Sequence, residues 1–345
     1  MTDLGTATPE AANARRWDGA LPGCYEVWYL TFNHRASQTG YWIRYTLEAP
    51  QTGHGEPYAQ LWFARFDARD PRRTFGINRR FPITALRAET GPFALAIGDA
   101  VLRGESMRGG LAGGGHDVRW DLRWRSARAV LHQLPEVMYA RGGVGETTVV
   151  SPNLDVALDG TLVIDGETVT LAAEPGGQTH LWGKKHAFQW AWGHCNAFTD
   201  RPGAALEALT VRLRRRGAVL PPLTVLTLVL DGETIALNGF RHTPFARARM
   251  STGLYALSGR DRSIRVEAEF RCRPDDMVVA SYADPDGEPS FCANTEVGDL
   301  RVTVFRRYRG RFVETDRLLA PRTGHFEVAS RDRDPAVVRD HVTVR

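Results

Sequence analysis

The sequence predicts an all-β protein built from two tandem antiparallel β-barrels, and three observations support this prediction. Short runs rich in Val, Ile, Leu, Thr and aromatic residues recur along the chain, separated by Gly, Pro, Asn and Asp turn signals. No stretch keeps a helical period over three turns. A length of 345 residues suffices for two barrels with buried cores, which we place at 17–175 and 176–345.

The first half begins with three expected strands, at 24–34, 41–47 and 58–66, and the first two should form a hairpin. The glycine run 113–115 predicts a flexible hairpin turn, because it lacks the Lys and Ser/Thr of a phosphate-binding loop and a strand follows it. The second half continues as short β-prone segments.

Two Asp-Gly pairs predict tight hairpins, Asp165-Gly166 in VIDGETVTL and Asp231-Gly232 in VLDGETIAL. Between them lies Pro175-Gly176-Gly177, which we expect to interrupt any strand and to mark the boundary between the two halves.

Composition points to an ordinary folded protein. Hydrophobic residues make up 43% and charged residues 24% of the chain, with no run of eighteen apolar residues and no cationic, apolar leader. Four widely spaced cysteines form no CxxC pair, so we expect reduced thiols in a cytoplasmic protein. Peripheral contact with a membrane stays compatible with these features.

The net charge of +4 is weak support for a nucleic-acid partner. Of the 44 basic residues only Lys184 and Lys185 are lysines, and the arginines are scattered apart from short clusters at 212–216 and 306–311. Such clusters need no partner when they alternate along a solvated strand face. We therefore expect no nucleic-acid ligand.

The stretch 180–198, HLWGKKHAFQWAWGHCNAF, combines aromatic side chains with groups that carry protons. At strand period, one face would hold three Trp, three His and a Lys. The stretch would reach roughly 60 Å if extended, so we expect a bend or break near Gly183 or Gly193. Since imidazoles and ammonium groups are costly to bury without partners, the stretch predicts a ligand pocket. An ordinary aromatic core is the competing interpretation.

Two motifs resemble a known superfamily. The strand YEVWYL at 25–30 and the segment WAWGHCNAF at 190–198 resemble segments of the lipocalin-like superfamily that contains carotenoid 1,2-hydratase, tocopherol cyclase and AttH-type proteins. The residues that carry the resemblance are Glu26, Trp28, Tyr29, Trp190, Trp192, Asn196 and Phe198. The resemblance implies tandem lipocalin-like barrels and an apolar, often isoprenoid-like ligand. It also implies, in some members, proton-initiated hydration or cyclisation without a metal or organic cofactor.

We therefore predict a cofactor-independent hydratase or cyclase that acts on a hydrophobic, isoprenoid- or polyene-like molecule. A non-catalytic carrier of an apolar metabolite is the alternative. Protonating an alkene requires a positioned acid, and the resulting carbocation needs aromatic faces around it. Glu26 is the candidate acid, with His180, His186 and His194 as rivals, although an ion pair with an arginine such as Arg44 would give Glu26 a structural role. The residues expected to bind substrate are Trp28, Tyr29, Trp42, Trp62, Trp182, Lys184, Trp190, Trp192 and Asn196.

Other kinds of site fit the sequence less well. A metal site of His180, His186 and His194 is disfavoured, because their strand spacing places neighbours on the order of 20 Å apart unless the chain folds back. No G-x-S-x-G motif is present, and Cys195 points away from His194 on a strand. A Schiff base on Lys184 and carbohydrate binding by exposed Trp stay open as alternatives.

Overall fold

The structure, a computed structural model, describes residues 8–126, 128–139 and 146–344. Its first sheet contains β1 (Cys24–His34), β2 (Thr39–Ala49), β3 (Tyr58–Asp67), β4 (Phe75–Pro82), β5 (Leu86–Thr90), β6 (Phe93–Ile97), β7 (Ala100–Arg103), β8 (Ser106–Gly113), β9 (His116–Ser126), β10 (Leu131–His132), β11 (Thr147–Ile164), β12 (Glu167–Gly183) and β25 (Val342–Val344). The strand order is β25-β4-β3-β2-β1-β12-β11-β9-β8-β7-β6-β5, with β10 beside β11. All described pairs in it are antiparallel except β25 with β4.

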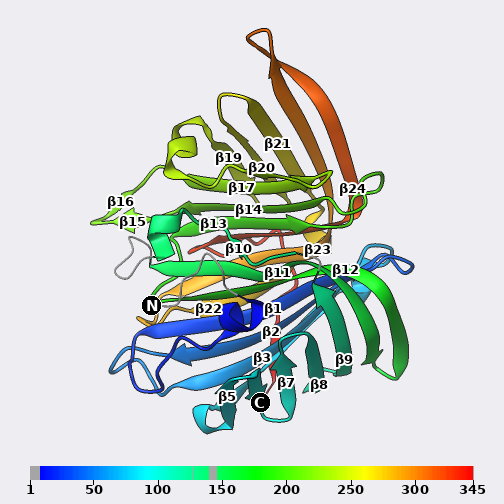
Figure 1. Cartoon of the computed structure of the whole chain (residues 1–345). Helices are drawn as coiled ribbons and strands as arrows, with labels where there is room; N and C mark the ends of the chain where they lie inside the picture. The colour runs from blue at the N-terminus through cyan, green and yellow to red at the C-terminus, as the bar shows by residue number, and fades with distance from the viewer. Residues whose placement is uncertain (1–7, 127, 140–145, 345) are drawn as a thin grey trace.

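The second sheet contains β13 (Gln189–Cys195), β14 (Ala205–Arg212), β17 (Leu223–Leu230), β18 (Glu233–Ala236), β19 (Arg247–Ser251), β20 (Leu254–Arg260), β21 (Ile264–Arg271), β22 (Val278–Ala283), β23 (Pro289–Tyr308) and β24 (Arg311–Ser330). Its order is β18-β17-β14-β13-β24-β23-β21-β20-β19, with β22 beside β23. β15 (Arg214–Arg215) and β16 (Ala218–Val219) form a small separate ribbon. The two sheets lie one above the other in Figure 1.

Helices are short in the described part of the chain. They are α1 (Pro9–Asn13) and the 3₁₀ turns η2 (Pro71–Arg73), η3 (Ile83–Ala85), η4 (Glu136–Tyr139), η5 (Phe240–Phe245) and η6 (Pro274–Asp276). None of these helices is long and apolar enough to cross a membrane.

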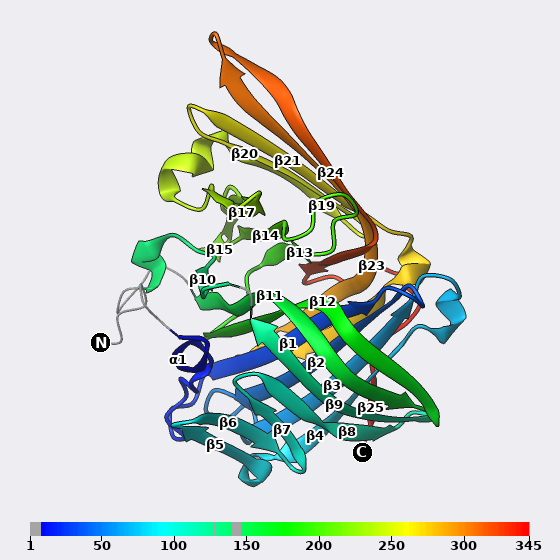
Figure 2. The same ribbon diagram turned by 45° about the vertical axis from the view of Figure 1, so that its right-hand side comes forward.

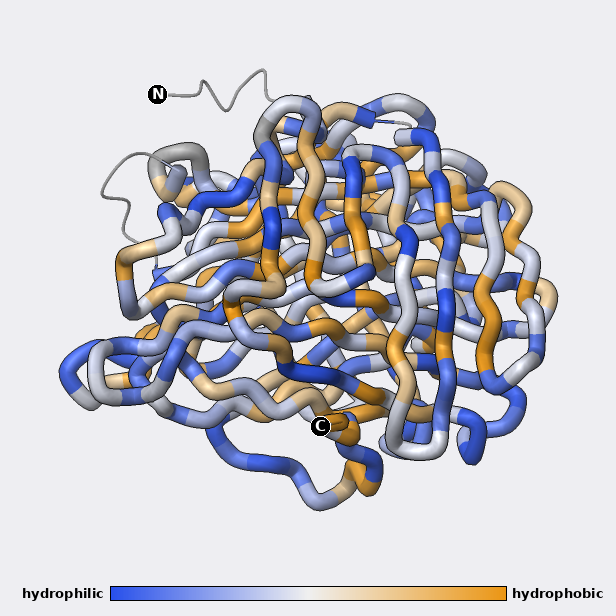
Figure 3. Tube along the Cα trace, turned by 90° about the horizontal axis from the view of Figure 1, so that it is seen from below, coloured by the Kyte–Doolittle hydropathy of each residue, from blue (hydrophilic) through white to orange (hydrophobic). Residues whose placement is uncertain are grey.

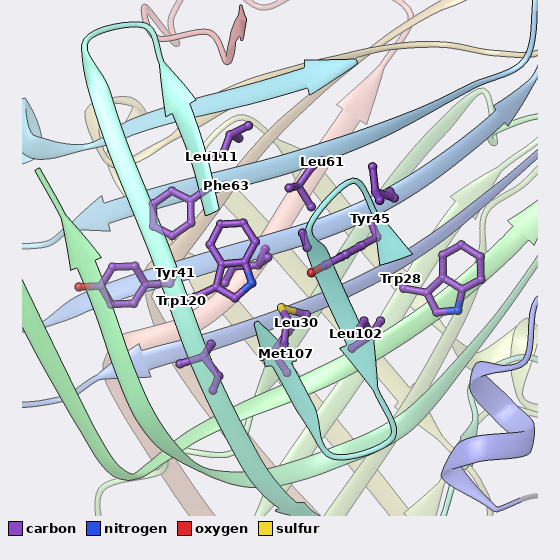
Figure 4. Packing of buried hydrophobic residues seen from close by; sticks show 14 of the residues in the cluster. Trp28, Leu30, Tyr41, Tyr45, Leu61, Phe63, Leu102, Met107, Leu111 and Trp120 are labelled. Atoms are coloured by element: carbon purple, nitrogen blue, oxygen red, sulfur yellow. The ribbon is translucent and has the colours of Figure 1, made fainter. Parts of the chain in front are cut away.

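Each sheet curls around a hydrophobic core of its own, which confirms the predicted fold of two lipocalin-like barrels. On β1, Trp28 and Leu30 face the first core, while Val27 and Tyr29 face the second barrel. Figure 4 shows side chains from β1–β3 and from β7–β9 filling the space between these strands. The same alternation appears as orange and blue segments along many strands in Figure 3.

The predicted hairpins are present. β1 and β2 pair from Cys24 with Ala49 to His34 with Thr39. Both Asp-Gly pairs adopt positive φ, with 54° and 85° at 165–166 and 50° and 82° at 231–232. These values fit the type I′ turns of two-residue β-hairpins.

Pro175-Gly176-Gly177 does not interrupt a strand, so that prediction is wrong. β12 runs through it, and Pro175 and Gly176 pair with Ala157 and Val156 of β11. The β11–β12 pairing contains register shifts, or β-bulges, next to this segment. At such bulges a proline without an N–H donor can be part of a strand. The first sheet therefore continues to Gly183, and the chain crosses to the second sheet between Gly183 and Gln189, not at 175–176.

A third hydrophobic cluster joins the barrels. It contains the outward-facing side chains of β1–β3 and residues of β13 and β22–β24: Tyr25, Val27, Tyr29, Trp42, Trp62, Ala64, Phe66, Trp190, Trp192, Val278, Ala280, Tyr282, Cys292, Val297 and Ala329. The backbones approach closely where β2 meets β23, because a Cβ at Gly40 would lie 2.4 Å from Cβ of Glu296 and 2.5 Å from its carbonyl oxygen. We call this contact the inter-barrel interface.

The segment 339–344 contacts both barrels, since His341 hydrogen-bonds to Val279 of β22 and β25 pairs with β4. Val342 of β25 pairs with Ile77 of β4, so β25 extends the first sheet (Figure 2). His341 packs against Trp42 and Trp62, with ring centroids 5.4 Å apart in each case. His341 is only 9% exposed.

Burial lowers the pKa of His341 to about 3, so this residue should make the protein sensitive to acid. The unfolded chain takes up a proton near pH 6.5, whereas the folded protein keeps the imidazole neutral. Stability is therefore full above pH 6.5 and falls as the pH drops toward 3, by up to roughly 4 kcal/mol. We expect His341→Phe to flatten this slope in urea unfolding measured across pH, and the exposed His54→Gln to leave it unchanged. An unaltered slope in His341→Phe would contradict the assignment.

Candidate active site

The aromatic stretch 180–198 is divided between the two barrels. His180 lies on β12, whereas Trp190, Trp192 and His194 lie on β13, and the strand ends at Gly183. This confirms the predicted break near Gly183. The side chains consequently do not form one continuous face, and the two ends of the stretch face different spaces.

Glu26 and His180 lie at one end of the first barrel, which α1 and the segment after it cover (Figure 2). The Glu26 carboxylate is 1% exposed and accepts hydrogen bonds from the backbone N–H groups of Arg16 at 2.7 Å and Trp17 at 3.0 Å. His180 Nδ1 donates to the carbonyl oxygen of Ala12 at 2.6 Å, and its Nε2 lies 2.9 Å from Glu26 Oε1. The His180 ring stacks on Trp28 at 4.7 Å. These contacts give Glu26 a role in fixing the N-terminal segment.

We therefore expect Glu26→Gln to act mainly on stability. The amide keeps its shape, but its NH₂ group faces a backbone N–H donor and would leave buried groups unpaired. A loss of about 1–3 kcal/mol in the free energy of unfolding follows. Chemical denaturation at neutral pH measures it. Unchanged stability together with a complete loss of turnover would instead support Glu26 as the acid.

A cavity of about 110 Å³ lies between the barrels, lined mostly by apolar and aromatic side chains. Its walls come from β1, β11 and β12 of the first barrel and from β13, β14, β17 and β24 of the second. The lining residues are Tyr25, Tyr29, Gln133, Leu134, Met138, Glu146, Thr147, Val149, Leu181, Lys185, His186, Ala187, Trp190, Trp192, Leu209, Val211, Leu213, Leu223 and Glu327. We call it the inter-barrel cavity.

Glu327 places a carboxylate against the aromatic wall of this cavity. It lies on β24 directly opposite Trp192 of β13, and its Oε1 accepts a hydrogen bond from Trp190 Nε1 at 2.6 Å. Glu327 could not be singled out from the sequence, because in HFEVAS it looks like an ordinary polar strand residue. Its position depends on pairing with a strand 137 residues away from it.

Trp192 is fixed by another carboxylate, that of the buried Glu207. Glu207 Oε1 accepts from Trp192 Nε1 and from Gln133 Nε2, both at 2.6 Å, and Oε2 accepts from His194 Nδ1 at 2.9 Å. Each indole N–H in the cavity wall thus donates to a carboxylate, which holds both rings in place.

Tyr29 completes this wall. Its ring meets Trp192 edge-on, with centroids 5.6 Å apart and planes at 88°. Burial and the neighbouring Glu327 and Glu207 carboxylates raise the pKa of Tyr29 well above its usual value. Its hydroxyl group therefore stays protonated at physiological pH.

The structure brings four of the sequence-predicted site residues to the inter-barrel cavity, namely Tyr29, His186, Trp190 and Trp192. The others lie elsewhere: Glu26, Trp28, His180 and Trp182 at the end of the first barrel, Trp42 and Trp62 around Arg44 and His341, His194 behind Trp192, and Lys184 in solvent. Asn196 donates to Asp155 Oδ1 and to the carbonyl oxygen of Gly176.

Two arrangements that were weighed as alternatives from the sequence can also be compared with the structure. Arg44 does not pair with Glu26 but stacks on Tyr282, with 4.3 Å between the guanidinium carbon and the ring centroid. His180, His186 and His194 do not converge on one centre, because each pairs with a different carboxylate, those of Glu26, Asp284 and Glu207.

Comparison with known proteins agrees with this architecture. A sequence profile of the tocopherol cyclase-like family matches residues 154–329, about half of the chain. The chain belongs to this family. The matched segment of the tocopherol cyclase-like chain includes Trp190, Trp192, Glu207 and Glu327, and membership confirms the superfamily resemblance. The uncharacterized protein Rv0493c of Mycobacterium tuberculosis is 28% identical over 335 residues, which cover 94% of this chain and 92% of that protein.

Solved structures show the same fold. CghA, crystallised with Sch210972, superposes on the tocopherol cyclase-like chain with a TM-score of 0.58 at 9% identity, over 90% of each chain. An AttH-type protein of Nitrosomonas europaea gives 0.55 at 15% identity, over 90% of this chain and 93% of that one. Kievitone hydratase of Nectria haematococca gives 0.50 at 10% identity, over 94% and 95%. At these identities the likeness concerns the fold.

Proposed function

We propose that this protein is a hydratase- or cyclase-type enzyme that acts on a hydrophobic, isoprenoid- or polyene-like molecule in the inter-barrel cavity. The observation that carries the proposal is the carboxyl group of Glu327 beside the aromatic side chains of Trp190 and Trp192 in a mostly apolar cavity wall. Membership of the tocopherol cyclase-like family supports this reaction class.

Glu327 is the acid in this proposal. Its carboxyl group protonates a substrate double bond, and the π electrons of that bond form the new C–H bond. The carbocation left on the neighbouring carbon is stabilised by the electron-rich faces of Trp190, Trp192 and Tyr29. The acid is thus a group of the chain itself, as the cofactor-independent prediction requires.

The size of the cavity bears on the binding mode. At about 110 Å³ it is smaller than typical ligand sites of ~300–1,000 Å³. We propose that only the reacting end of the molecule enters it and that the remainder extends past Lys185 and Glu146, which also line the cavity.

A binding protein without catalysis is the second candidate. The indole N–H groups of Trp190 and Trp192 each donate to a carboxylate oxygen, which fixes both rings. A rigid aromatic wall of this kind would suit a protein that only binds its ligand.

Deuterium uptake distinguishes the two functions. The purified protein is incubated in D₂O with a lipid extract of its own host, and mass spectrometry searches for molecules that gain carbon-bound deuterium. An enzyme that protonates an alkene produces such a molecule, because the new C–H bond does not exchange with water. A carrier retains a ligand from the extract and produces none, which would remove the enzymatic function.

A further inference from the structure

A second proton-transfer group lies in the wall of the inter-barrel cavity. His186 Nδ1 is 2.6 Å from Asp284 Oδ1, which also accepts the backbone N–H of His186 at 3.0 Å. Asp284 Oδ2 accepts from Arg331 Nη1 at 2.7 Å, and Arg331 Nη2 donates to the carbonyl oxygen of His186 at 3.0 Å. The Asp284 and Arg331 groups thereby hold both the ring and the backbone of His186.

This arrangement determines which ring nitrogen carries the proton. A carboxylate only accepts hydrogen bonds, so Nδ1 of the neutral imidazole is the protonated nitrogen and Nε2 carries the free lone pair. The hydrogen bonds described for His186 involve its Nδ1, its backbone N–H and its carbonyl oxygen, and His186 lines the cavity. The ring is held flat between aromatic neighbours, with Tyr25 stacked at 4.1 Å and Trp190 at 5.3 Å.

We infer that His186, oriented by Asp284, is the general base of the proposed reaction and removes a proton from an oxygen nucleophile, so that the substrate reaction is an addition of O–H across a double bond. The inference rests on the proposed function and adds to it the residue that accepts a proton.

The step balances with Glu327 as the acid. Glu327 gives its proton to one alkene carbon, and the oxygen lone pair bonds to the carbocation at the other carbon. The O–H bond of the nucleophile breaks, its electrons stay on oxygen, and its proton passes to His186 Nε2. Trp190 lies between the two groups, because it stacks on His186 and hydrogen-bonds to Glu327. Proton exchange with water then restores the neutral imidazole and the carboxylic acid.

The charges around His186 favour a neutral imidazole that can accept a proton. Burial lowers the pKa of His186, and the hydrogen bond and charge of Asp284 only partly offset it, while Arg44 and Arg331 lower it further. Burial raises the pKa of Asp284, but His186 and Arg331 outweigh this and lower it overall, so Asp284 is ionised. Tyr25 and Tyr282, which stack on the His186 ring, are buried phenols with raised pKa values and stay neutral. The neighbouring Lys185 pairs with Asp286 and Glu288.

Diethylpyrocarbonate tests this arrangement without any substrate, because it carbethoxylates neutral, accessible imidazole nitrogens. Peptide mass spectrometry should find His186 labelled in the folded protein. The labelling rate should rise with pH and should already have reached its plateau at pH 6.5. Asp284→Asn should lower that rate about tenfold at the plateau, since the carboxylate makes Nε2 more basic. The exposed His54 serves as the internal control, and its rate should be the same in both proteins.

Three results would overturn the inference: an unlabelled His186, a labelling rate unaffected by Asp284→Asn, or an inflection above pH 7. Should Asp284→Asn fail to fold, two-bond ¹⁵N–¹H couplings in the wild-type protein decide the tautomer, and a proton on Nε2 would overturn the inference. If no molecule gains deuterium in D₂O, the proposed function fails while the labelling result on His186 stands by itself. Incorporation of oxygen from H₂¹⁸O identifies water as the nucleophile, and its absence identifies a hydroxyl group of the substrate.

Discussion

Glu327→Gln is expected to reduce deuterium uptake from D₂O into the substrate by about 10²- to 10⁴-fold. The amide cannot donate a proton to a double bond, although it has nearly the same shape and its oxygen can still accept from Trp190 Nε1. Ligand retention and the unfolding midpoint should therefore stay close to those of the wild-type protein. Mass spectrometry of the D₂O reaction measures the effect.

Glu314→Gln is the matched control for this variant. Glu314 lies on the same strand, β24, but its side chain is exposed at the surface and pairs with Arg317. Its variant should keep full deuterium uptake. Uptake that survives in Glu327→Gln and disappears in Glu26→Gln, with both proteins folded, would transfer the acid's role to Glu26.

Gly40→Ala is expected to destabilise the protein by about 3 kcal/mol or more, because the new methyl group would overlap the Glu296 backbone. Neither β2 nor β23 can move aside without breaking its pairing with neighbouring strands, so the overlap pushes the two barrels apart. The midpoint of urea unfolding measures the loss. The inter-barrel cavity should open at the same time, and deuterium uptake should fall.

Gly239→Ala is the matched control, since a Cβ there would meet no atom closer than 3.7 Å. It should change the free energy of unfolding by no more than about 0.5 kcal/mol. Equal stability of the two variants would show that the barrels can separate at Gly40 without cost.

The fold could be predicted because its signals are local. Alternation along β1 and the two Asp-Gly turns each depend on a few consecutive residues, and they appear in the structure where the sequence places them. The crossing between the sheets was misplaced for a related reason. Pro175 and Gly176 continue β12 because bulges in the pairing of β12 with β11 accommodate these two residues. The local sequence around Pro175 does not show this pairing, since it depends on another strand.

The candidate site was predicted only in part. Tyr29, His186, Trp190 and Trp192 carry chemistry that suits a pocket, and all four line the inter-barrel cavity. The place of this cavity between the barrels could not be predicted, because strand period separates two faces without showing which of them meets the other barrel.

The roles of Glu26 and Glu327 depend on contacts that a sequence does not display. The Glu26 carboxylate accepts hydrogen bonds from backbone N–H groups of the N-terminal segment. A pattern of side chains in the sequence does not show which backbone N–H groups a carboxylate will meet. Glu327 reaches the cavity because β24 pairs with β13, a non-local contact.

The central claim is that an apolar ligand reacts in the cavity between the barrels. Photolabelling with a diazirine-bearing farnesol analogue, followed by peptide mapping, tests it most directly. We predict adducts on the cavity walls, at Val149, Leu181 and Trp192, and their loss when unlabelled farnesol competes. Adducts confined to the core of the first barrel, at Trp120 or Met107, would contradict the account.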